Sequence, residues 1–332
     1  MTIPFIQKYT PRNLRDFFYE HSFKYAIQNL LDVDFLNILF IGNAGVGKTS
    51  IINALINEYY CKHNKEFSEE PPESNRLDSN VLYINNLNEQ GISYYRSEVK
   101  TFCQTKCTIA NKKKILVIDD LDMISLHSQQ EFRNCMDSYG NNIHFIASCT
   151  NTQEVINSIQ SRTSIIHLYP LSHDSQMNII DHIIQTENIN MTKKMKECII
   201  RISDNSTSLL INYLEKCKLL GNDVNEENIY NISTTLSHYI FDDYINYCIK
   251  MDVKNAINVL YELYDKGYSV IDIFDSFFCY IKQTNAIDDA HKYAIVSYIS
   301  NYITIFYNTH EDEIELAIMT KNIIDVFKPL NK

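Results

Sequence analysis

The sequence predicts an α/β fold: a P-loop domain built on a parallel sheet, followed by two all-helical domains. Three observations support this prediction. A glycine-rich loop at residues 42–47 follows an apolar run and precedes a helical pattern. Five short apolar runs alternate with amphipathic stretches in the first half, as is typical of buried parallel sheets. The second half has helical periodicity only, and its long span between Pro170 and Pro329 contains no proline.

The composition argues against several classes of protein. The 332 residues suit two or three domains, at about 100–200 residues each. A net charge of −11 argues against a wholly basic nucleic-acid coat but leaves room for a local basic strip. No long uncharged apolar run and no secretory pattern occurs, so we expect no membrane partner and a nuclear or cytoplasmic location. Nine scattered cysteines without a CxxC pair indicate reduced thiols rather than disulfides or zinc.

The apolar runs of the first half are the predicted strands. We place the sheet domain at residues 1–170, a module of three helices at 171–235 and a helical bundle at 236–332. The polar stretch Lys62–Asn80, which contains two prolines, is predicted to be a surface loop. The predicted strands are Asn37–Ile41, Val81–Asn85, Lys114–Asp119, His144–Cys149 and Ile165–Tyr169.

The most specific motif lies between the first predicted strand and a helix predicted over Thr49–Tyr59. Backbone N–H groups of such a glycine loop, together with the helix N-terminus, form a nest for phosphate. We expect Lys48 to reach the β- and γ-phosphates and the Thr49 hydroxyl to bind Mg²⁺, so ATP and Mg²⁺ are the predicted cofactors. The flanking strand and helix argue against a chance match. The predicted nucleotide-binding residues of the loop are Gly42, Asn43, Ala44, Gly45, Val46, Gly47, Lys48, Thr49 and Ser50.

Two acidic residues follow the third predicted strand. An apolar strand that ends in acid places a carboxylate at the carboxyl edge of the sheet, beside the phosphates. We expect Asp119 to hold Mg²⁺ through water and Asp120 to orient or activate the attacking water. The alternative is that both are solvated acids at a strand end, which is a stronger rival for Asp120 than for Asp119.

Further motifs occur in a fixed order along the chain. Gln7–Pro11 resembles an E-K-Y-R-P segment, and Gly91–Phe102 resembles a G-I-x-x-x-R-x-x-I-K-x-F helix. Ser148–Asn151 is similar to a sensor-1 strand end, Ile159–Thr163 to an I-Q-S-R-C motif, and Gly267–Ile273 to a G-Y-S-x-x-D-I stretch. Because order and spacing match over almost the whole chain, the sequence resembles a small subunit of the replication factor C type of sliding-clamp loader, an AAA+ ATPase.

The resemblance implies an ATP-binding subunit of a DNA clamp loader, with an AAA+ P-loop domain, a helical lid and an all-α collar. Such a subunit joins other clamp-loader subunits in a hetero-oligomeric ring. ATP binding would organise the ring to open a sliding clamp at primer–template DNA, and hydrolysis would release clamp and DNA.

The resemblance also implies roles for individual residues. Asn151 would be sensor 1, although the count to Ser161 is one residue short, which leaves Thr150 as a competing candidate. Arg162 would be an arginine finger that acts on ATP held by the neighbouring subunit; the alternative is an arginine that caps a helix or pairs with a surface acid. Tyr9 and Pro11 would help to line the adenine pocket.

The resemblance places two basic residues against DNA. Arg96 and Lys100 would face the DNA backbone inside the ring. Their spacing of four puts them on one helix face, and a like-charge pair there hints at an anionic partner. A solvated helix face remains the alternative.

Departures from the family pattern bear on hydrolysis. Asp120 stands where the family has Glu, and Ser208 falls where the sensor-2 Arg belongs. A missing cation near the γ-phosphate weakens transition-state stabilisation. The sequence therefore leaves two rivals: a mainly structural clamp-loader subunit that hydrolyses ATP weakly, and another AAA+ replication or repair ATPase.

Overall fold

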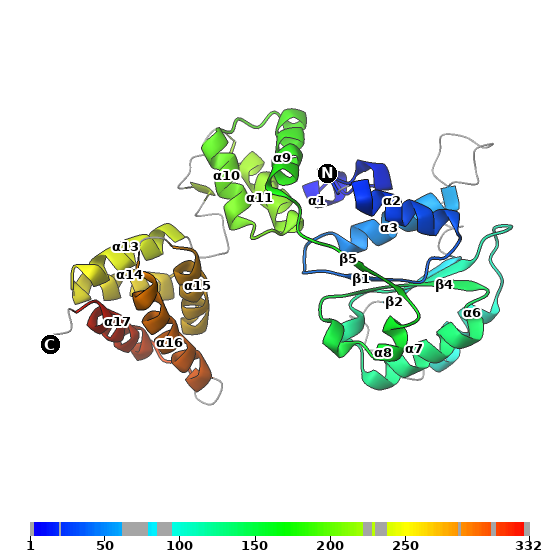
Figure 1. Ribbon diagram of the computed structural model, residues 1–332. Helices are drawn as coiled ribbons and strands as arrows, with labels where there is room; N and C mark the ends of the chain where they lie inside the picture. The colour runs from blue at the N-terminus through cyan, green and yellow to red at the C-terminus, as the bar shows by residue number, and fades with distance from the viewer. Residues whose placement is uncertain are drawn as a thin grey trace. The chain divides into compact units, whose positions relative to one another are not determined.

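The chain forms two compact units, Met1–Glu226 and Glu227–Lys332. The computed structural model describes residues 3–19, 21–61, 79–84, 95–221, 228–229, 238–284, 287–306 and 310–328. Each unit is described by itself below (Figure 1).

The centre of the first unit is a parallel sheet. Within the described residues it has five strands, in the order β2-β3-β4-β1-β5, and all four pairings are parallel. The carboxyl ends of all strands therefore meet at one edge, where α/β proteins bind their ligands. The strands are β1 (Ile38–Ile41), β2 (Val81–Ile84), β3 (Lys114–Ile118), β4 (Ile143–Cys149) and β5 (Ser164–His167).

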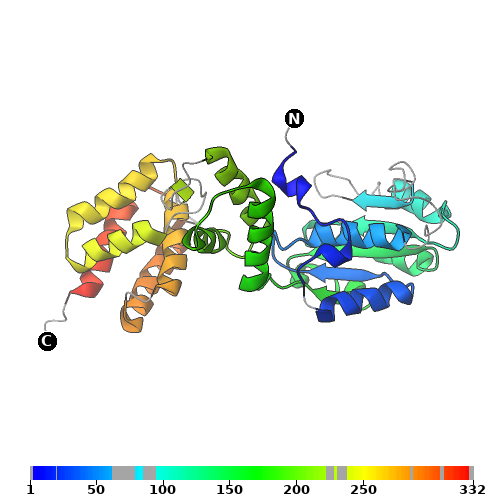
Figure 2. The ribbon, with the colours of Figure 1, turned by 90° about the horizontal axis from the view of Figure 1, so that it is seen from above.

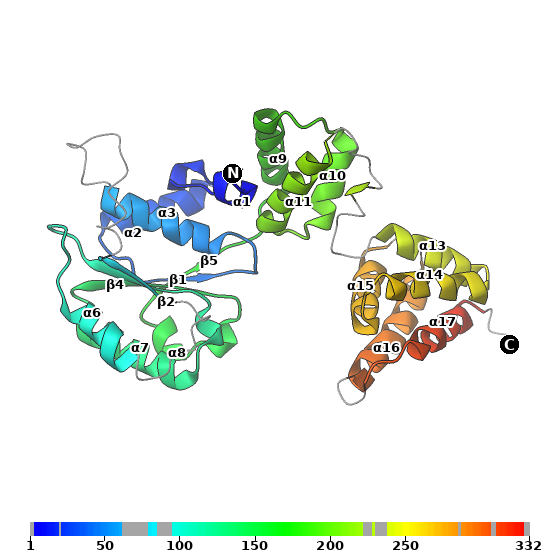
Figure 3. The same cartoon turned by 180° about the vertical axis from the view of Figure 1, so that it is seen from behind.

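Helices cover both faces of this sheet, as a buried parallel sheet requires. The helices α2 (His21–Asp32) and α3 (Lys48–Cys61) lie on one face, while α6 (Lys100–Gln104), α7 (Leu126–Tyr139) and α8 (Asn157–Gln160) lie on the other (Figures 1 and 3). Seen from above, the blue helices α2 and α3 lie in front of the strands (Figure 2).

Side chains of β1 alternate between the two layers. Phe40 belongs to the apolar core beneath α2 and α3, whereas Leu39 belongs to the core on the α7 side. This alternation is the two-residue period of a strand, and it explains why the run is apolar throughout.

Three helices follow β5 within the first unit: α9 (His173–Glu187), α10 (Lys193–Ile202) and α11 (Thr207–Leu220). Each begins at a hydroxyl residue whose side chain accepts a hydrogen bond from the first turn, namely Ser172, Thr192 and Ser206. Such N-caps are typically worth about 1 kcal/mol each. The short N-terminal helix α1 (Phe5–Lys8) packs against α11.

The second unit is helical in its described residues. The helices are α13 (His238–Ile249), α14 (Val253–Asp265), α15 (Val270–Gln283), α16 (Asp289–Phe306) and α17 (Ile314–Phe327). Aromatic rings fill their core: Phe277 lies 5.3 Å from both Phe241 and Tyr244, measured between ring centroids. The buried Tyr244 hydroxyl donates to Thr320 Oγ1 at 3.0 Å, so its polar group is satisfied.

The structure confirms the predicted fold class. All five predicted strands form, and their ends differ from the prediction by one or two residues; Asp119 lies just past β3 rather than inside it. The predicted loop over Lys62–Asn80 falls mostly on residues outside the described ranges. The first unit holds both the sheet and α9–α11, so the predicted division into three domains stays a prediction. In the described part of the chain, no helix has the length and apolarity that crossing a membrane requires.

Candidate nucleotide site

The phosphate loop joins β1 to α3 at the carboxyl edge of the sheet. Gly45 and Gly47 have φ values of +76° and +99°, which side chains rarely adopt. A Cβ on Gly42 would lie 2.8 Å from the carbonyl oxygen of Leu168, and a Cβ on Gly45 would lie 2.1 Å from Ser206 Oγ. Glycine is therefore required in this loop, at Gly45 and Gly47 for the backbone conformation and at Gly42 and Gly45 because Leu168 and Ser206 approach closely.

Lys48 is folded back over this loop. Its side-chain Nζ donates to the carbonyl oxygens of Gly42 at 2.8 Å and Asn43 at 3.2 Å, and the residue is 8% exposed. These bonds hold the ammonium group inside the loop, where its charge faces any phosphate that the loop binds.

Thr49 connects the phosphate loop to the carboxyl end of β3. The Thr49 hydroxyl donates to Asp119 Oδ2 at 2.8 Å, so the two predicted metal ligands lie side by side. Hydroxyl and carboxylate oxygens fit Mg²⁺, which typically takes one or two carboxylates and completes its shell with phosphate oxygens and water.

Ser148 holds both predicted acids in place. This buried residue of β4 donates its hydroxyl to Asp119 Oδ1 and accepts the backbone N–H of Asp120 at 3.1 Å. Asp120 has a left-handed backbone, with φ 52° and ψ 55°, a conformation in which Asp and Asn are enriched. Desolvation at the sheet edge, with the negative charge of Asp119, raises the pKa of Asp120 above its ordinary value.

The sensor-1 candidates follow β4, and both have local partners. Thr150 donates its hydroxyl to Asp122 Oδ2 at 2.5 Å, while the Asn151 side chain accepts the Gln153 N–H at 3.0 Å as the cap of a short 3₁₀ helix. Burial tends to raise the pKa of Asp122, but the hydrogen bonds from Thr150 and Asn151 outweigh it and hold the pKa below its ordinary value. Of the two, Thr150 directly follows the last strand residue, Cys149, which pairs with the last residue of β1.

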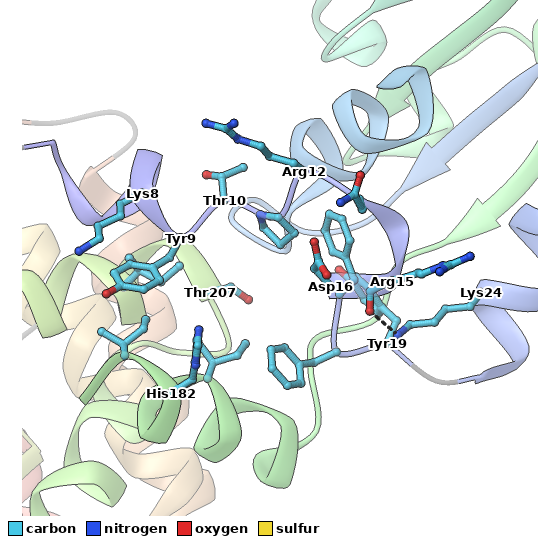
Figure 4. Close-up of a pocket in the computed structure, with 17 residues that line it drawn as sticks. Lys8, Tyr9, Thr10, Arg12, Arg15, Asp16, Tyr19, Lys24, His182 and Thr207 are labelled. Carbon is cyan, nitrogen blue, oxygen red and sulfur yellow. Dashed lines mark hydrogen bonds between the residues drawn. The ribbon is translucent and has the colours of Figure 1, made fainter. Parts of the chain in front are cut away.

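A cavity of about 840 Å³ lies between the N-terminal segment and the helices α9 and α11 (Figure 4). Tyr9 and Pro11 line it, as predicted for an adenine pocket, together with His182 from α9 and Thr207 from α11. A smaller cavity of about 80 Å³ shares Tyr9 and Pro11 and also touches Val46, Gly47 and Ser50. The smaller cavity therefore reaches the phosphate loop, while the larger cavity has a size that suits a small organic ligand.

The carboxylate of Glu187 connects the N-terminal segment to the three helices α9–α11, called the lid below. Glu187, at the end of α9, accepts hydrogen bonds from Lys8, Tyr9 and Lys218, although its side chain is only 5% exposed. These three donors, Lys218 first, lower the pKa of Glu187 to about 2. The backbone N–H of Phe5 also donates to Glu215 on α11, at 3.1 Å. Sequence reasoning missed this cluster, because its members lie up to 210 positions apart.

We expect E187Q to loosen the N-terminal helix. The neutral amide keeps the shape but loses the charge-assisted bonds to two lysines and Tyr9. Hydrogen exchange at pH 7 should become faster at the Lys8 and Tyr9 amides, which donate to the carbonyl oxygens of Pro4, the residue before α1, and of Phe5. E262Q, on an exposed face of α14, is the matched control and should leave this exchange unchanged.

The stabilisation that the Glu187 carboxylate provides depends on pH. Because the folded-state pKa of Glu187 is about 2, below its ordinary 4.5, its stabilising contribution is complete above about pH 4.5 and is lost as the pH falls toward 2. Unchanged exchange in E187Q at pH 7 would show that the ion pairs do not hold α1.

The start of α11 lies directly on the phosphate loop. The Thr207 backbone N–H donates to the Gly45 carbonyl at 3.0 Å, and Ser206 packs against Gly45. Ser208, at the position where the resemblance expects the sensor-2 Arg, lines the small cavity beside Val46 and Gly47. The lid thus reaches the site through small polar side chains and a helix N-terminus, without an arginine at this position.

Arg162 lies away from this loop. Its guanidinium donates to both carboxylate oxygens of Asp137 on α7, at 2.6 and 3.4 Å, and to the carbonyl of Ser158 on α8 at 2.8 Å. Arg162 is the main cause that holds the pKa of Asp137 below its ordinary value. The α7–α8 layer covers the sheet face opposite α2 and α3 (Figure 1). The surface-acid pairing weighed from the sequence is therefore present in the single chain.

The two predicted DNA-binding residues lie where a π-helical turn, Tyr95–Val99, runs into α6. Lys100 is exposed at the start of α6. The side chain of Arg96 and residues 91–94 lie outside the described residues. The shared face of Arg96 and Lys100 stays a prediction.

Family comparisons agree with this geometry. Residues 38–171 match the ATPase family associated with various cellular activities (AAA), and residues 239–303 match the replication factor C C-terminal domain. The chain thus combines an AAA domain with a replication factor C C-terminal domain. The first match begins at β1 and ends just after β5, and the second covers α13–α15 with most of α16.

Curated relatives of this chain carry names that fit these two domains. The probable replication factor C subunit 2 of Dictyostelium discoideum is 26% identical over 87% of this chain and 82% of its own length. The replication factor C small subunit of Methanoculleus marisnigri is 27% identical over 78% of this chain and 76% of its own length. Replication factor C subunit 5 of Mus musculus is 25% identical, with 82% and 77% covered.

Among solved structures, the fold is similar to that of a point variant of RuvB from Thermotoga maritima. The TM-score is 0.51 at 12% identity, over 67% of this chain and 71% of that chain. At this identity the likeness concerns the fold alone.

Proposed function

We propose that this chain is an ATP-binding subunit of a sliding-clamp loader. The hydrogen bond between Thr49 and Asp119, which joins the phosphate loop to the acidic end of β3, carries the ATP-binding part of the proposal. The clamp-loader part is carried by the match of residues 239–303 to the replication factor C C-terminal domain. Together with Lys48, the pair of Thr49 and Asp119 forms a triphosphate site at the sheet edge, and the cavity beside Tyr9 and Pro11 supplies room for the nucleoside.

Each residue of the site then has a role. The loop N–H groups and Lys48 bind the phosphates, and Thr49 and Asp119 would hold Mg²⁺, which neutralises phosphate charge when bound. Asp120 accepts the proton of the attacking water, and its raised pKa suits a base better than that of an ordinary aspartate. For sensor 1 we keep both candidates: Thr150 directly follows β4 but bonds Asp122 through its hydroxyl, and the Asn151 side chain accepts the Gln153 N–H.

The partners follow from the replication factor C resemblance. We propose that the chain assembles with other clamp-loader subunits, acts on a sliding clamp and contacts primer–template DNA, with Arg96 and Lys100 facing the phosphates. The exposure of Lys100 supports this contact. Such a subunit would work wherever DNA is replicated in the cell.

A second candidate is a mainly structural subunit that binds ATP and hydrolyses it slowly. The lid favours this candidate, because Ser208 stands at the sensor-2 position beside the phosphate loop. Single-turnover hydrolysis in the assembled complex separates the two functions: a structural subunit retains its ATP while its neighbours hydrolyse theirs.

The proposed site predicts that K48A removes most nucleotide affinity. Charge-assisted hydrogen bonds are worth about 1.5–3 kcal/mol, so affinity for a fluorescent ATP analogue should fall about 10- to 100-fold. The matched control is K113A. Lys113 precedes β3, at the opposite edge of the sheet, and pairs with Asp34 at 3.6 Å. If K48A binds as tightly as K113A, the phosphate site is assigned wrongly.

A further inference from the structure

One carboxylate holds the segment that carries the two sensor-1 candidates. Asp122 belongs to the short 3₁₀ helix Leu121–Met123, which directly follows Asp120. Its Oδ2 accepts three hydrogen bonds from the end of β4: the Thr150 backbone N–H at 2.9 Å, the Thr150 hydroxyl at 2.5 Å and the Asn151 backbone N–H at 2.9 Å. Hydrogen bonds to a charged acceptor are stronger than neutral ones, so this carboxylate fixes both residues to the loop after β3.

The held segment begins at the phosphate site. In the sheet, β4 lies between β3 and β1. The carbonyl of Cys149, its last residue, accepts the backbone N–H of Gly42 from the phosphate loop at 3.2 Å, and Ser148 accepts the backbone N–H of Asp120 at 3.1 Å. The chain therefore leaves β4 between the phosphate loop and the acids, and Asp122 sets the course of the next two residues.

These hydrogen bonds leave one side-chain donor open. The Thr150 hydroxyl gives its only proton to Asp122, so it has none left for a ligand. The Oδ1 of Asn151 accepts the Gln153 N–H at 3.0 Å, which determines the side of the amide on which Nδ2 lies. Asn151 is exposed, and its Nδ2 makes no hydrogen bond with the residues that the structure describes. The two N–H donors of this nitrogen are the kind of group that phosphate oxygens accept.

We infer that Asp122 is a positioning residue, which selects Asn151 over Thr150 as the side chain that contacts the γ-phosphate. The inference rests on the proposed ATP-binding function and deepens it. Asp122 does not itself touch the nucleotide. It occupies the Thr150 hydroxyl and holds the Asn151 backbone, so that the open amide of Asn151 keeps a fixed place beside the triphosphate.

The test measures how strongly the full chain prefers a non-hydrolysable ATP analogue over ADP in equilibrium binding. N151A should lower this preference about 10-fold, because it removes a hydrogen bond to a charged phosphate. D122A should lower it about 3- to 10-fold, because the amide is then poorly placed. D122N keeps an oxygen acceptor and should lie between D122A and wild type. T150V removes one of the three hydrogen bonds and should stay near wild type.

The double variant D122A/N151A separates positioning from a general structural effect. If Asp122 acts through Asn151, the double variant should show the same preference as N151A alone, because effects of coupled residues do not add. The matched control is D252A, in the second unit. Asp252 accepts the backbone N–H of Asn255 at 3.3 Å and its Nδ2 at 2.6 Å, so D252A also removes a carboxylate that holds backbone. It should leave the preference unchanged.

Several results would contradict the inference. Unchanged preference in N151A or D122A, or losses that add fully in the double variant, would overturn it. A loss in T150V that N151A lacks would also overturn it and would make Thr150 the contact. If the wild-type chain binds neither the ATP analogue nor ADP, the proposed function itself is wrong.

Discussion

Replacing Arg162 with alanine should leave the ATP affinity of the isolated chain unchanged but depress hydrolysis at one adjacent site of the assembled ring. In the single chain, the described contacts of Arg162 are with Asp137 and Ser158 and not with the phosphate loop. A neighbour's triphosphate would compete with Asp137 for the same planar guanidinium. Arginine fingers in related systems contribute about 10³–10⁵ in rate.

The measurement uses mixed assemblies in which the R162A chain sits beside a neighbour whose own phosphate loop is intact or disabled. R133A is a matched control, because Arg133 pairs with the same Asp137 at 3.0 Å but comes from α7. Hydrolysis should fall only with R162A and only beside an intact neighbour. Equal losses in both assemblies would mean that Arg162 does not serve that neighbour, and lost ATP binding in the lone chain would place its action in cis.

Replacing Asp120 with asparagine should abolish most hydrolysis by this chain while nucleotide binding persists. Asparagine adopts the left-handed backbone at this position as readily as aspartate, so the fold is preserved. It cannot accept the proton of water, and loss of a general base costs about 10²–10⁴ in rate. Single-turnover hydrolysis in the assembled complex measures the effect.

The raised pKa of Asp120 adds a second measurement. Protonation at acid pH removes the base, so the wild-type rate should fall with decreasing pH at a value above the ordinary 3.8 of aspartate. D120N should lack that fall. D204N makes the same change at another left-handed aspartate, with φ 42°, and should leave hydrolysis intact. Wild-type turnover by D120N would show that Asp120 is not the base but a solvated acid at the strand end.

The sheet and the phosphate loop could be predicted because their signals are local. Buried parallel strands are apolar throughout, and a loop that needs left-handed backbone needs glycine, as at Gly45 and Gly47. The neighbouring positions of Thr49 and Asp119 followed from the shared carboxyl edge of the strands. The ends of the strands were predicted less exactly, because the polar residue that follows an apolar run can lie inside or outside the hydrogen-bonded strand.

Features that depend on distant parts of the chain could not be predicted. Ser148 shares a motif with the sensor-1 candidates, but its bond to Asp119 depends on the register of β3 against β4. The pairing of Arg162 with Asp137 depends on how α7 packs beside α8. That Thr207 Oγ1 makes no hydrogen bond within the described residues depends on how the start of α11 packs against its neighbours.

The contact between α1 and the lid has a consequence for synthesis of the chain. Residues of α1 leave the ribosome well before Glu187 and Glu215, to which they bond and which are 179 and 210 positions further on. At about 5–20 residues per second, these partners emerge about 10–40 s later. A four-residue helix is not stable by itself, and closing so long a loop is slow. The nucleotide cavity is therefore completed only after α11 has emerged and the N-terminal segment has returned to it.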